Sequence, residues 1–249
     1  MTRLAFSSSD PAAGRAALGL VVLQTDETIE PEFQRLLRGR EVALYTTRIP
    51  SARTVTPETL KAMEAALPAA AGLLPAALEF DAIGYACTSG ATLIGPEAVA
   101  RLIREATHAR AVSNPLSAVI AACEALAVRR LGFVTPYQAE VSAAMRKTLE
   151  AHGLEITAFG SFEEENDSAV ARIDPASILD AALTVGGTPD TDAVFLSCTN
   201  LRTLDMIAPA EARLEKPVIT SNQALAWHML GLAGVSGSGD GAEFGRLMG

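Results

Sequence analysis

The chain has 249 residues, 49% of them hydrophobic, and a formal net charge of −9. This length fits one large domain or two of about 120 residues, and the hydrophobic fraction excludes a disordered chain. Nucleic acid and anionic membrane surfaces are excluded as partners, because both are bound through clustered Lys and Arg and the sequence has no such cluster.

Three cysteines are too few, and an odd number, for a secreted disulfide scaffold, so we expect free thiols and a cytoplasmic protein. Residues 1–15 contain no apolar stretch long enough for a signal peptide and are expected to form a loose tail. No uncharged apolar run reaches the roughly 18 residues that a membrane-spanning helix needs.

Apolar runs alternate with helical patterns along the first part of the chain. A Thr-Pro-Glu sequence at 56–58 is typical of a helix start, and residues 46–50 are expected to form a loop. The predicted strands lie at 17–23, 41–45, 81–87 and 110–114, and the predicted helices at about 28–37, from 56, at 95–108 and at 116–128.

The same order begins again near residue 130. The predicted strands lie at 130–134, 154–159, 192–198 and 216–222, and the predicted helices at 138–152, at 175–183 and from 223. Leu18 and Leu131 are 113 residues apart, Cys87 and Cys198 are 111 apart, and the Ser-Asn pairs at 113–114 and 221–222 are 108 apart. These similar offsets indicate a duplication. The alternation predicts right-handed crossovers and parallel sheets covered on both faces.

The predicted fold class is therefore α/β, with two pseudo-symmetric Rossmann-like (flavodoxin-like) halves. Each half has a parallel four-stranded sheet, and the active site lies in the cleft between the halves. We assign residues 16–117 to the first half and 118–227 to the second, and expect residues 228–249 to pack back on the first half.

Cys87 and Cys198 each end a predicted strand, just before a predicted helix, and each is followed by Thr and then by Ser or Asn. Open α/β sheets bind ligands at such strand ends, and a helix N-terminus lowers a thiol pKa from its usual value of about 8.5. A facing pair suits proton removal by one thiolate and delivery by the other thiol, or covalent addition to a carbon–carbon double bond. Each could also be a buried small hydrophobe, as expected for Cys123 within a helical pattern.

Several polar residues near these strand ends are candidate substrate ligands. Hydroxyl, amide and backbone donors hold a carboxylate without a metal, although the same residues serve equally as helix caps. Asp26, after the first strand, is expected to face the cleft or to cap a helix, and Tyr137 to bind a carboxylate or to pack in a turn. The donors that follow the cysteines are Thr88, Ser89, Thr199 and Asn200.

The sequence has no motif for a metal site or for a nucleotide cofactor. The three histidines have no metal-ligand spacing, so no metal site is predicted. Neither a glycine-rich dinucleotide motif after the first strand nor a phosphate-binding P-loop is present, so neither a dinucleotide nor a nucleoside triphosphate is predicted as cofactor.

Segments 84–90 (Gly-Tyr-Ala-Cys-Thr-Ser-Gly) and 195–200 (Phe-Leu-Ser-Cys-Thr-Asn) resemble the aspartate/glutamate racemase superfamily. Within it they resemble the branch of maleate isomerases, arylmalonate decarboxylases and ectoine-utilisation racemase-like proteins, over about residues 18–228. The resemblance implies cofactor-free catalysis on a small carboxylate or amino acid. It also implies that Cys87 and Cys198 are the catalytic pair and that Tyr137 and Asn166 bind substrate carboxylates. Decarboxylases of this branch keep only the second cysteine, so Cys87 counts against decarboxylation.

One departure concerns the segment after the first strand, where maleate isomerases carry Ser-Asn-Thr-Thr and this chain has Thr25, Asp26, Glu27 and Thr28. A carboxylate there repels a dicarboxylate, by about 1–4 kcal/mol for unit charges about 4 Å apart, and attracts an ammonium. The segment is most similar to the ectoine-utilisation group. We therefore predict a racemase or epimerase acting at the α carbon of an aspartate-like or diaminobutyrate-like amino acid, with Thr25 and Asp26 among its substrate ligands.

Three alternatives remain. The nearest is a maleate cis–trans isomerase that works by cysteine addition. Duplicated α/β halves also close on ligands without chemistry, as in a carboxylate-binding or sensor protein. A redox disulfide between Cys87 and Cys198 is a weaker alternative, because it needs Cα atoms within about 7 Å. In each case we expect a homo-oligomer, a dimer or a tetramer.

Overall fold

A computed structural model describes residues 3–7, 14, 16–235 and 241–249. The predicted loose tail over 1–15 lies largely outside the described residues. Among the described residues, no helix is both long and apolar enough to cross a membrane.

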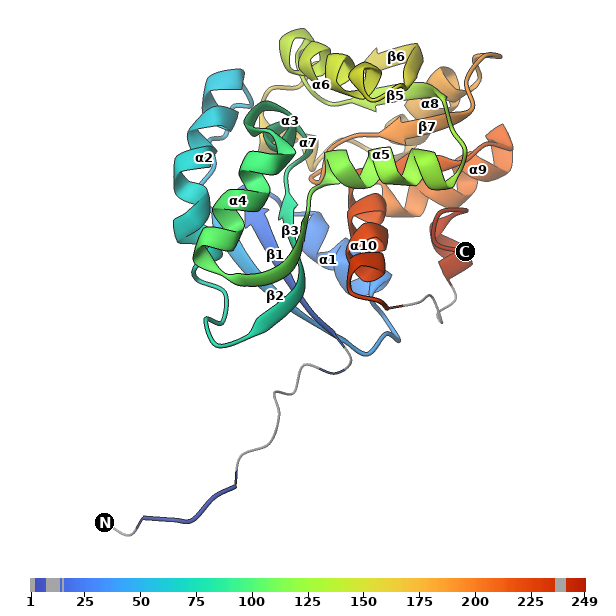
Figure 1. Cartoon of the computed structure of the whole chain (residues 1–249). Helices are drawn as coiled ribbons and strands as arrows, with labels where there is room; N and C mark the ends of the chain where they lie inside the picture. Colours follow the sequence, from blue (N-terminus) through green and yellow to red (C-terminus); the bar gives the residue numbers. More distant parts are fainter. Residues whose placement is uncertain (1–2, 8–13, 15, 236–240) are drawn as a thin grey trace.

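Two four-stranded parallel sheets, each with helices packed against it, form the molecule (Figure 1). The first series comprises β1 Ala16–Leu23, α1 Ile29–Leu36, β2 Val42–Ile49, α2 Pro57–Ala71, β3 Glu79–Ala86, α3 Thr88–Ile94, α4 Pro96–Ala106, β4 His108–Ser113 and α5 Pro115–Ala125. The second comprises β5 Arg130–Thr135, α6 Ala139–Ala151, β6 Glu155–Ser161, α7 Asp167–Val170, α8 Pro175–Gly186, β7 Ala193–Leu196, η1 Leu204–Met206, α9 Ile207–Leu214, β8 Val218–Thr220, α10 Ser221–Leu232 and η2 Gly241–Phe244.

The two sheets have the same topology. Their strand orders are β2-β1-β3-β4 and β6-β5-β7-β8, so each strand of the first sheet has a counterpart in the second. All eight residues of β1 are buried, as expected for a strand covered by helices on both faces. The predicted fold class, with two like halves, is confirmed.

The helices α5 and α10 each cross to the other half. Helix α10 follows β8 of the second sheet but contacts β3 and β4 of the first, while α5 follows β4 and contacts β8. The crossing depends on Gly84 in β3, because a Cβ atom there would lie 2.6 Å from the sulfur of Met229 in α10. Each half therefore contributes one helix, α5 or α10, that packs against the sheet of the other half. The predicted boundary between the halves at 117/118 stays a proposal.

Two local predictions were wrong. Residues 46–49 belong to β2 and not to a loop, because their backbone pairs with β1 through Ile49. Cys198 is not followed directly by a helix: a turn comes first, and α9 begins only at Ile207. Pairing with a neighbouring strand extends β2 despite its polar side chains, and this pairing is not visible in the local sequence.

The C-terminal segment contacts elements of both halves. Backbone N–H of Arg246 donates to the carboxylate of Glu211 in α9, and the Arg35 guanidinium of α1 lies 5.8 Å from the centre of the Phe244 ring. The side-chain amide of Gln223 in α10 also donates to the carbonyl of Phe244. This segment therefore packs where α1, α9 and α10 meet.

Candidate active site

Cys87 directly follows β3 and is the N-cap residue of α3. Its sulfur accepts a hydrogen bond from the backbone N–H of Gly90 at 3.2 Å, and the Ser89 hydroxyl lies 3.7 Å away. The thiol is 4% exposed. The strand end thus places a buried sulfur at the N-terminus of a short helix.

Cys198 lies at the corresponding end of β7 in a less usual backbone conformation. Its φ of 145° is one that residues with a side chain rarely adopt, at a cost of about 1–3 kcal/mol. Its N–H donates to the Ser221 hydroxyl at 3.0 Å, and its sulfur accepts from the N–H of Asn200 at 3.4 Å. Such strained residues cluster at functional sites, which supports a role for this cysteine beyond packing.

Short polar contacts join the two cysteine-bearing strand ends. The hydroxyls of Thr88 and Ser221 are 2.8 Å apart, and Ser221 also binds the N–H of Cys198. The Thr199 hydroxyl donates to the carbonyl of Ala86, at the end of β3, at 3.3 Å. The carboxyl ends of β3 and β7 therefore meet at one buried site.

Tyr137, which follows β5, lies at this site. It is 2% exposed, and its hydroxyl is close enough to Cys198 and Ser89 for both to affect its pKa. Burial raises the pKa of Tyr137 well above its usual value, and negative charge on either cysteine raises it further. The phenol is therefore a neutral hydrogen-bond donor beside the cysteine pair.

Burial also dominates the acidity of the two thiols. It raises the pKa of Cys87 to about 12 and that of Cys198 well above its usual value. The N–H groups of Gly90 and Asn200 lower the two values by less, while the negative charges of Asp167 and Asp26 raise them. The expected lowering of the thiol pKa by a helix N-terminus is thus outweighed, and both cysteines rest as neutral thiols.

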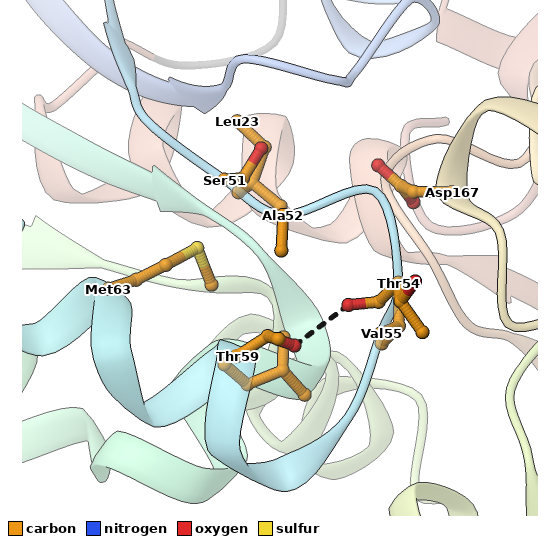
Figure 2. Close-up of a pocket in the computed structure, with 9 residues that line it drawn as sticks. Leu23, Ser51, Ala52, Thr54, Val55, Thr59, Met63 and Asp167 are labelled. Carbon is orange, nitrogen blue, oxygen red and sulfur yellow. Dashed lines mark hydrogen bonds between the residues drawn. The ribbon is translucent and has the colours of Figure 1, made fainter.

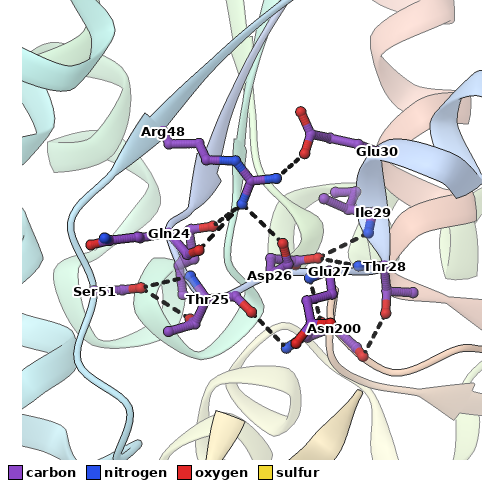
Figure 3. Close-up of polar contacts among 11 residues, drawn as sticks. Gln24, Thr25, Asp26, Glu27, Thr28, Ile29, Glu30, Arg48, Ser51 and Asn200 are labelled. Atoms are coloured by element: carbon purple, nitrogen blue, oxygen red, sulfur yellow. Dashed lines mark hydrogen bonds and ion pairs between the residues drawn. The ribbon is translucent and has the colours of Figure 1, made fainter. Parts of the chain in front are cut away.

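Asp26 caps the start of α1 (Figure 3) and lies close enough to both cysteines for its charge to affect their pKa values. Its Oδ1 accepts the N–H groups of Thr28 at 2.8 Å and Ile29 at 2.9 Å, whereas Oδ2 is buried without a hydrogen-bond partner. Burial raises the pKa of Asp26 to about 6, while the N–H groups of Ile29 and Thr28 and, by less, the Thr199 side chain lower it. Arg48 does not neutralise this carboxylate, because its guanidinium binds the carbonyl of Asp26 and pairs with Glu30.

Asn200 ties segment 25–27 to the second half of the molecule. Its side-chain oxygen accepts the N–H of Glu27 at 2.8 Å, and its amide donates to the carbonyls of Thr25 at 3.4 Å and Asp167 at 2.9 Å. Thr25 in turn donates its hydroxyl to the Asp167 carboxylate. Thr25 and Asn200 therefore lie in the polar shell around the cysteines.

Asn166 is not brought to the cysteine pair. It is exposed, and its side-chain oxygen caps α7 by accepting the N–H groups of Ser168 and Ala169. Its neighbour Asp167 is buried and lines a pocket with Ser51 and Met63, among others (Figure 2). The acidic residue beside the predicted asparagine therefore occupies the site.

Sequence reasoning missed four residues of this region: Glu32, Asp167, Ser221 and Asn222. A signal existed for two of them, because the Ser-Asn pair at 221–222 repeats the pair at 113–114. Glu32 carried no signal, since its position on α1 looks like that of any solvated helical glutamate. In the part of the chain that the structure describes, no group of three or more His, Cys, Asp or Glu side chains is arranged to hold a metal ion.

Buried thiols at the strand ends of two like α/β halves are typical of a class of cysteine-dependent enzymes with this duplicated fold. The sequence profile of the arylmalonate decarboxylase family matches residues 19–248, and the chain belongs to this family. This agrees with the resemblance to the aspartate/glutamate racemase superfamily.

Individual relatives include two kinds of enzyme. A maleate isomerase of Pseudomonas putida is 27% identical over 229 residues, which cover 86% of this chain and 90% of that protein. The arylmalonate decarboxylase of Bordetella bronchiseptica is 35% identical over 132 residues, so this match spans 53% of the chain and 55% of its relative.

A solved structure of a Nocardia farcinica maleate cis–trans isomerase superposes with a TM-score of 0.82 and 25% identity, covering 94% of this chain and 98% of that one. That protein is a cysteine-to-serine mutant holding a covalently bound succinylcysteine intermediate. Chemistry at a cysteine is thus documented in a protein of the same fold.

Proposed function

We propose that the protein is a cofactor-independent isomerase that racemises or epimerises a small amino acid at its α carbon, with Cys87 and Cys198 as the two acid–base groups. One observation carries the choice of an amino acid: the carboxylate oxygens of Asp26 are buried near the cysteine pair and pair with no Lys or Arg side chain among the described residues. An ammonium would bind such an oxygen, whereas a carboxylate would be repelled by it.

Two facing thiols account for the chemistry without a redox step. One thiolate takes the proton from Cα, so that a C–H bond breaks and an S–H bond forms. The thiol on the opposite face then gives its proton to Cα, and the configuration is inverted. Tyr137, close to Cys198, and Ser89, close to Cys87, would donate hydrogen bonds to the substrate carboxylate, which takes up negative charge between the two proton transfers.

The thiolate needed for the first step would form when substrate binds. Burial and the charges of Asp26 and Asp167 keep both thiols protonated in the free protein. A substrate ammonium between these carboxylates offsets their charge and lowers both thiol pKa values. A dianionic substrate would raise them further, so the electrostatics of the site favour an amino acid.

Maleate cis–trans isomerisation is the second candidate, and the relatives favour it. Maleate isomerases match this chain over 86% of its length, and a solved structure of similar fold holds a succinylcysteine. In this chain either cysteine would add to the double bond and the other would move a proton. The acidic residues of the site count against it.

Hydrogen exchange in deuterated water separates the two reactions. The protein would be incubated with L-amino acids and, separately, with maleate, and Cα deuterium, enantiomer ratio and fumarate would be measured. We expect Asp26→Asn to reduce exchange by roughly tenfold or more and to improve any maleate turnover.

Asp174→Asn is the matched control, because Asp174 is an exposed carboxylate that caps α8 and an Asn side chain can keep this cap. This variant should behave as the wild type. Maleate turnover by the wild type, without Cα exchange of any amino acid, would refute racemisation.

A further inference from the structure

We infer that Glu32 and Asn222 act together as positioning residues for Cys198. They hold the turn at 199–204 and, through it, keep the backbone of Cys198 in the conformation that its proton transfer needs. The inference rests on the proposed function, because it concerns one of the two cysteines that the proposed reaction uses. It does not depend on which amino acid is the substrate.

The two cysteines of the site differ in backbone conformation. Cys87 has a φ of −153°, which is ordinary extended backbone, and it is fixed as the N-cap residue of α3. Cys198 has a φ of 145° and is followed by a turn instead of a helix. A strained residue persists only where the surrounding structure holds it. Cys198 therefore needs support that Cys87 does not need.

Two segments contact Cys198 directly. Its N–H donates to the hydroxyl of Ser221, which begins α10, and its sulfur accepts from the N–H of Asn200, which lies in the turn. The conformation of Cys198 is thus set by the start of α10 and by turn 199–204. Any contact that fixes these two segments to each other also fixes Cys198.

Glu32 and Asn222 make this connection, and both are buried. The Asn222 amide, on α10, donates to the carbonyl of Thr199 at the start of the turn and to one carboxylate oxygen of Glu32. The other carboxylate oxygen accepts the N–H groups of Thr203 and Leu204 at the end of the turn. A single carboxylate from the first half of the molecule thus connects the turn to α10.

The counterpart of Asn222 in the first half has a different role. Asn114 caps α5, because its side-chain oxygen accepts the N–H of Ser117. Asn222 does not cap α10, since Thr220 is the N-cap and accepts the N–H of Gln223. The side-chain oxygen of Asn222 is buried without a hydrogen-bond partner among the described residues, which costs stability. The Asn222 side chain is therefore used for its amide donors, and these bind the turn and Glu32.

Two variants break this connection in different places. Glu32→Gln keeps the shape of the side chain but has one acceptor oxygen, so it cannot bind both the Asn222 amide and the two N–H groups of the turn. Asn222→Ala removes the amide and leaves the bonds of Glu32 to the turn in place. Glu211→Gln is the matched control, because Glu211 is also buried and accepts backbone N–H groups that lie outside turn 199–204.

Alkylation of the three cysteines by iodoacetamide tests the inference without any substrate. In both variants the turn should open more often, and we expect Cys198 to react roughly tenfold faster, because burial limits its reaction and a lost hydrogen bond to a charged group favours opening by at least this factor. Cys87 and Cys123 should keep their wild-type rates. Glu211→Gln should leave the ratio of the Cys198 rate to the Cys87 rate unchanged.

Mass spectrometry gives the three rates in one experiment, and urea unfolding gives the global stability of each protein. Equal acceleration at all three cysteines, which global unfolding would cause, would overturn the inference. So would an unchanged Cys198 rate in both variants, or the same selective acceleration in Glu211→Gln.

Cα exchange in deuterated water supplies a second measurement. The enantiomer that Cys87→Ser still exchanges is the one that uses Cys198 as its base. For this enantiomer we expect Glu32→Gln and Asn222→Ala to lower kcat by roughly tenfold or more with little change in KM, because a misplaced base impairs proton transfer more than binding. Exchange of the other enantiomer should fall less.

The two measurements separate this inference from the proposed function. Selective acceleration at Cys198, with no Cα exchange by the wild type, would leave the support of Cys198 standing and refute racemisation. Exchange by the wild type that falls equally for both enantiomers in the variants would overturn the positioning role and leave racemisation standing.

Discussion

Glu32 accepts a hydrogen bond of 2.7 Å from the side-chain amide of Asn222, a residue 190 positions later in the chain. The same amide also donates to the carbonyl of Thr199 at 2.8 Å. The other oxygen of Glu32 accepts the N–H groups of Thr203 and Leu204, both at 3.0 Å. The buried carboxylate of Glu32 on α1 thus binds the end of the turn that follows Cys198 directly, and it is linked to the start of this turn through Asn222.

Glu32 makes folding stability depend on pH. Burial raises its pKa from 4.5 to about 7, and the charge of Asp26 contributes, while the Asn222 amide and the two N–H groups lower it by less. Because the folded state binds this proton more tightly than the unfolded chain, the contribution is complete below pH 4.5 and is lost as pH rises through about 7.

In the wild type, this proton should make the unfolding free energy fall by on the order of 1–3 kcal/mol as pH rises over this range. We expect Glu32→Gln to abolish this fall, because Gln does not titrate. Urea unfolding of both proteins at several pH values measures it. The proton on Asp26, whose pKa is raised to about 6, adds a smaller loss of the same sign that Glu32→Gln leaves in place. An equally steep fall in the variant would contradict the role of Glu32.

Asn166 can be tested as a cap against its predicted role as a carboxylate ligand. Asn166→Ala removes the acceptor for the first N–H groups of α7 and should cost about 1 kcal/mol in stability and raise KM, because Asp167 begins this helix. Asn166→Asp keeps a capping oxygen and should behave as the wild type in both. Direct carboxylate binding would reverse the order, since an Asp there would repel the substrate and impair activity more than an Ala.

The repeated sequence pattern was enough to predict the two sheets and their helices. Strand ends could be placed because a buried parallel strand is a continuous apolar run, as in β1 and β3. The end of β2 could not, because Thr46 and Thr47 are extended by pairing with β1 and not by their own hydrophobicity. The exchange of α5 and α10 was likewise hidden, since it depends on contacts between distant segments.

Only part of the candidate site could be predicted from the sequence, because the rest also depends on contacts between distant segments. Cys87, Cys198 and Asp26 were found because each lies at or just after the end of a predicted strand, and strand ends meet at one edge of the sheet. Asn166 and Asp167 could not be told apart, because one step along a loop decides which side chain points inward. The role of Glu32 depends on burial against a turn that is about 170 residues away along the chain, and no local pattern records this.

Thiol alkylation should report substrate charge. In the free protein both cysteines are buried and their pKa values raised, so reaction with iodoacetamide at neutral pH should be slow. A bound amino acid whose ammonium offsets Asp26 and Asp167 should shift the pH profile of alkylation to lower pH. Mass spectrometry of Cys87 and Cys198 measures the two rates, with a small uncharged thiol as reference. A shift to higher pH with amino acids, or a downward shift with maleate, would contradict this electrostatic account.

Serine variants of the cysteines should separate the two halves of a two-base reaction. Cys87→Ser and Cys198→Ser should each reduce racemisation by roughly 10²–10⁴, since either change removes one proton-transfer group. Each variant keeps one thiol and should still exchange the Cα hydrogen of one enantiomer with deuterium, the two variants favouring opposite enantiomers.

Cys123→Ser is the matched control, because Cys123 is a third buried cysteine, within α5 and outside the site. It should lose stability by about 1 kcal/mol and keep racemisation. Chiral chromatography measures racemisation, and proton NMR in deuterated water measures exchange of the Cα hydrogen. Exchange of the same enantiomer by both site variants, or racemisation that survives either change, would show that the thiols do not act as opposed bases.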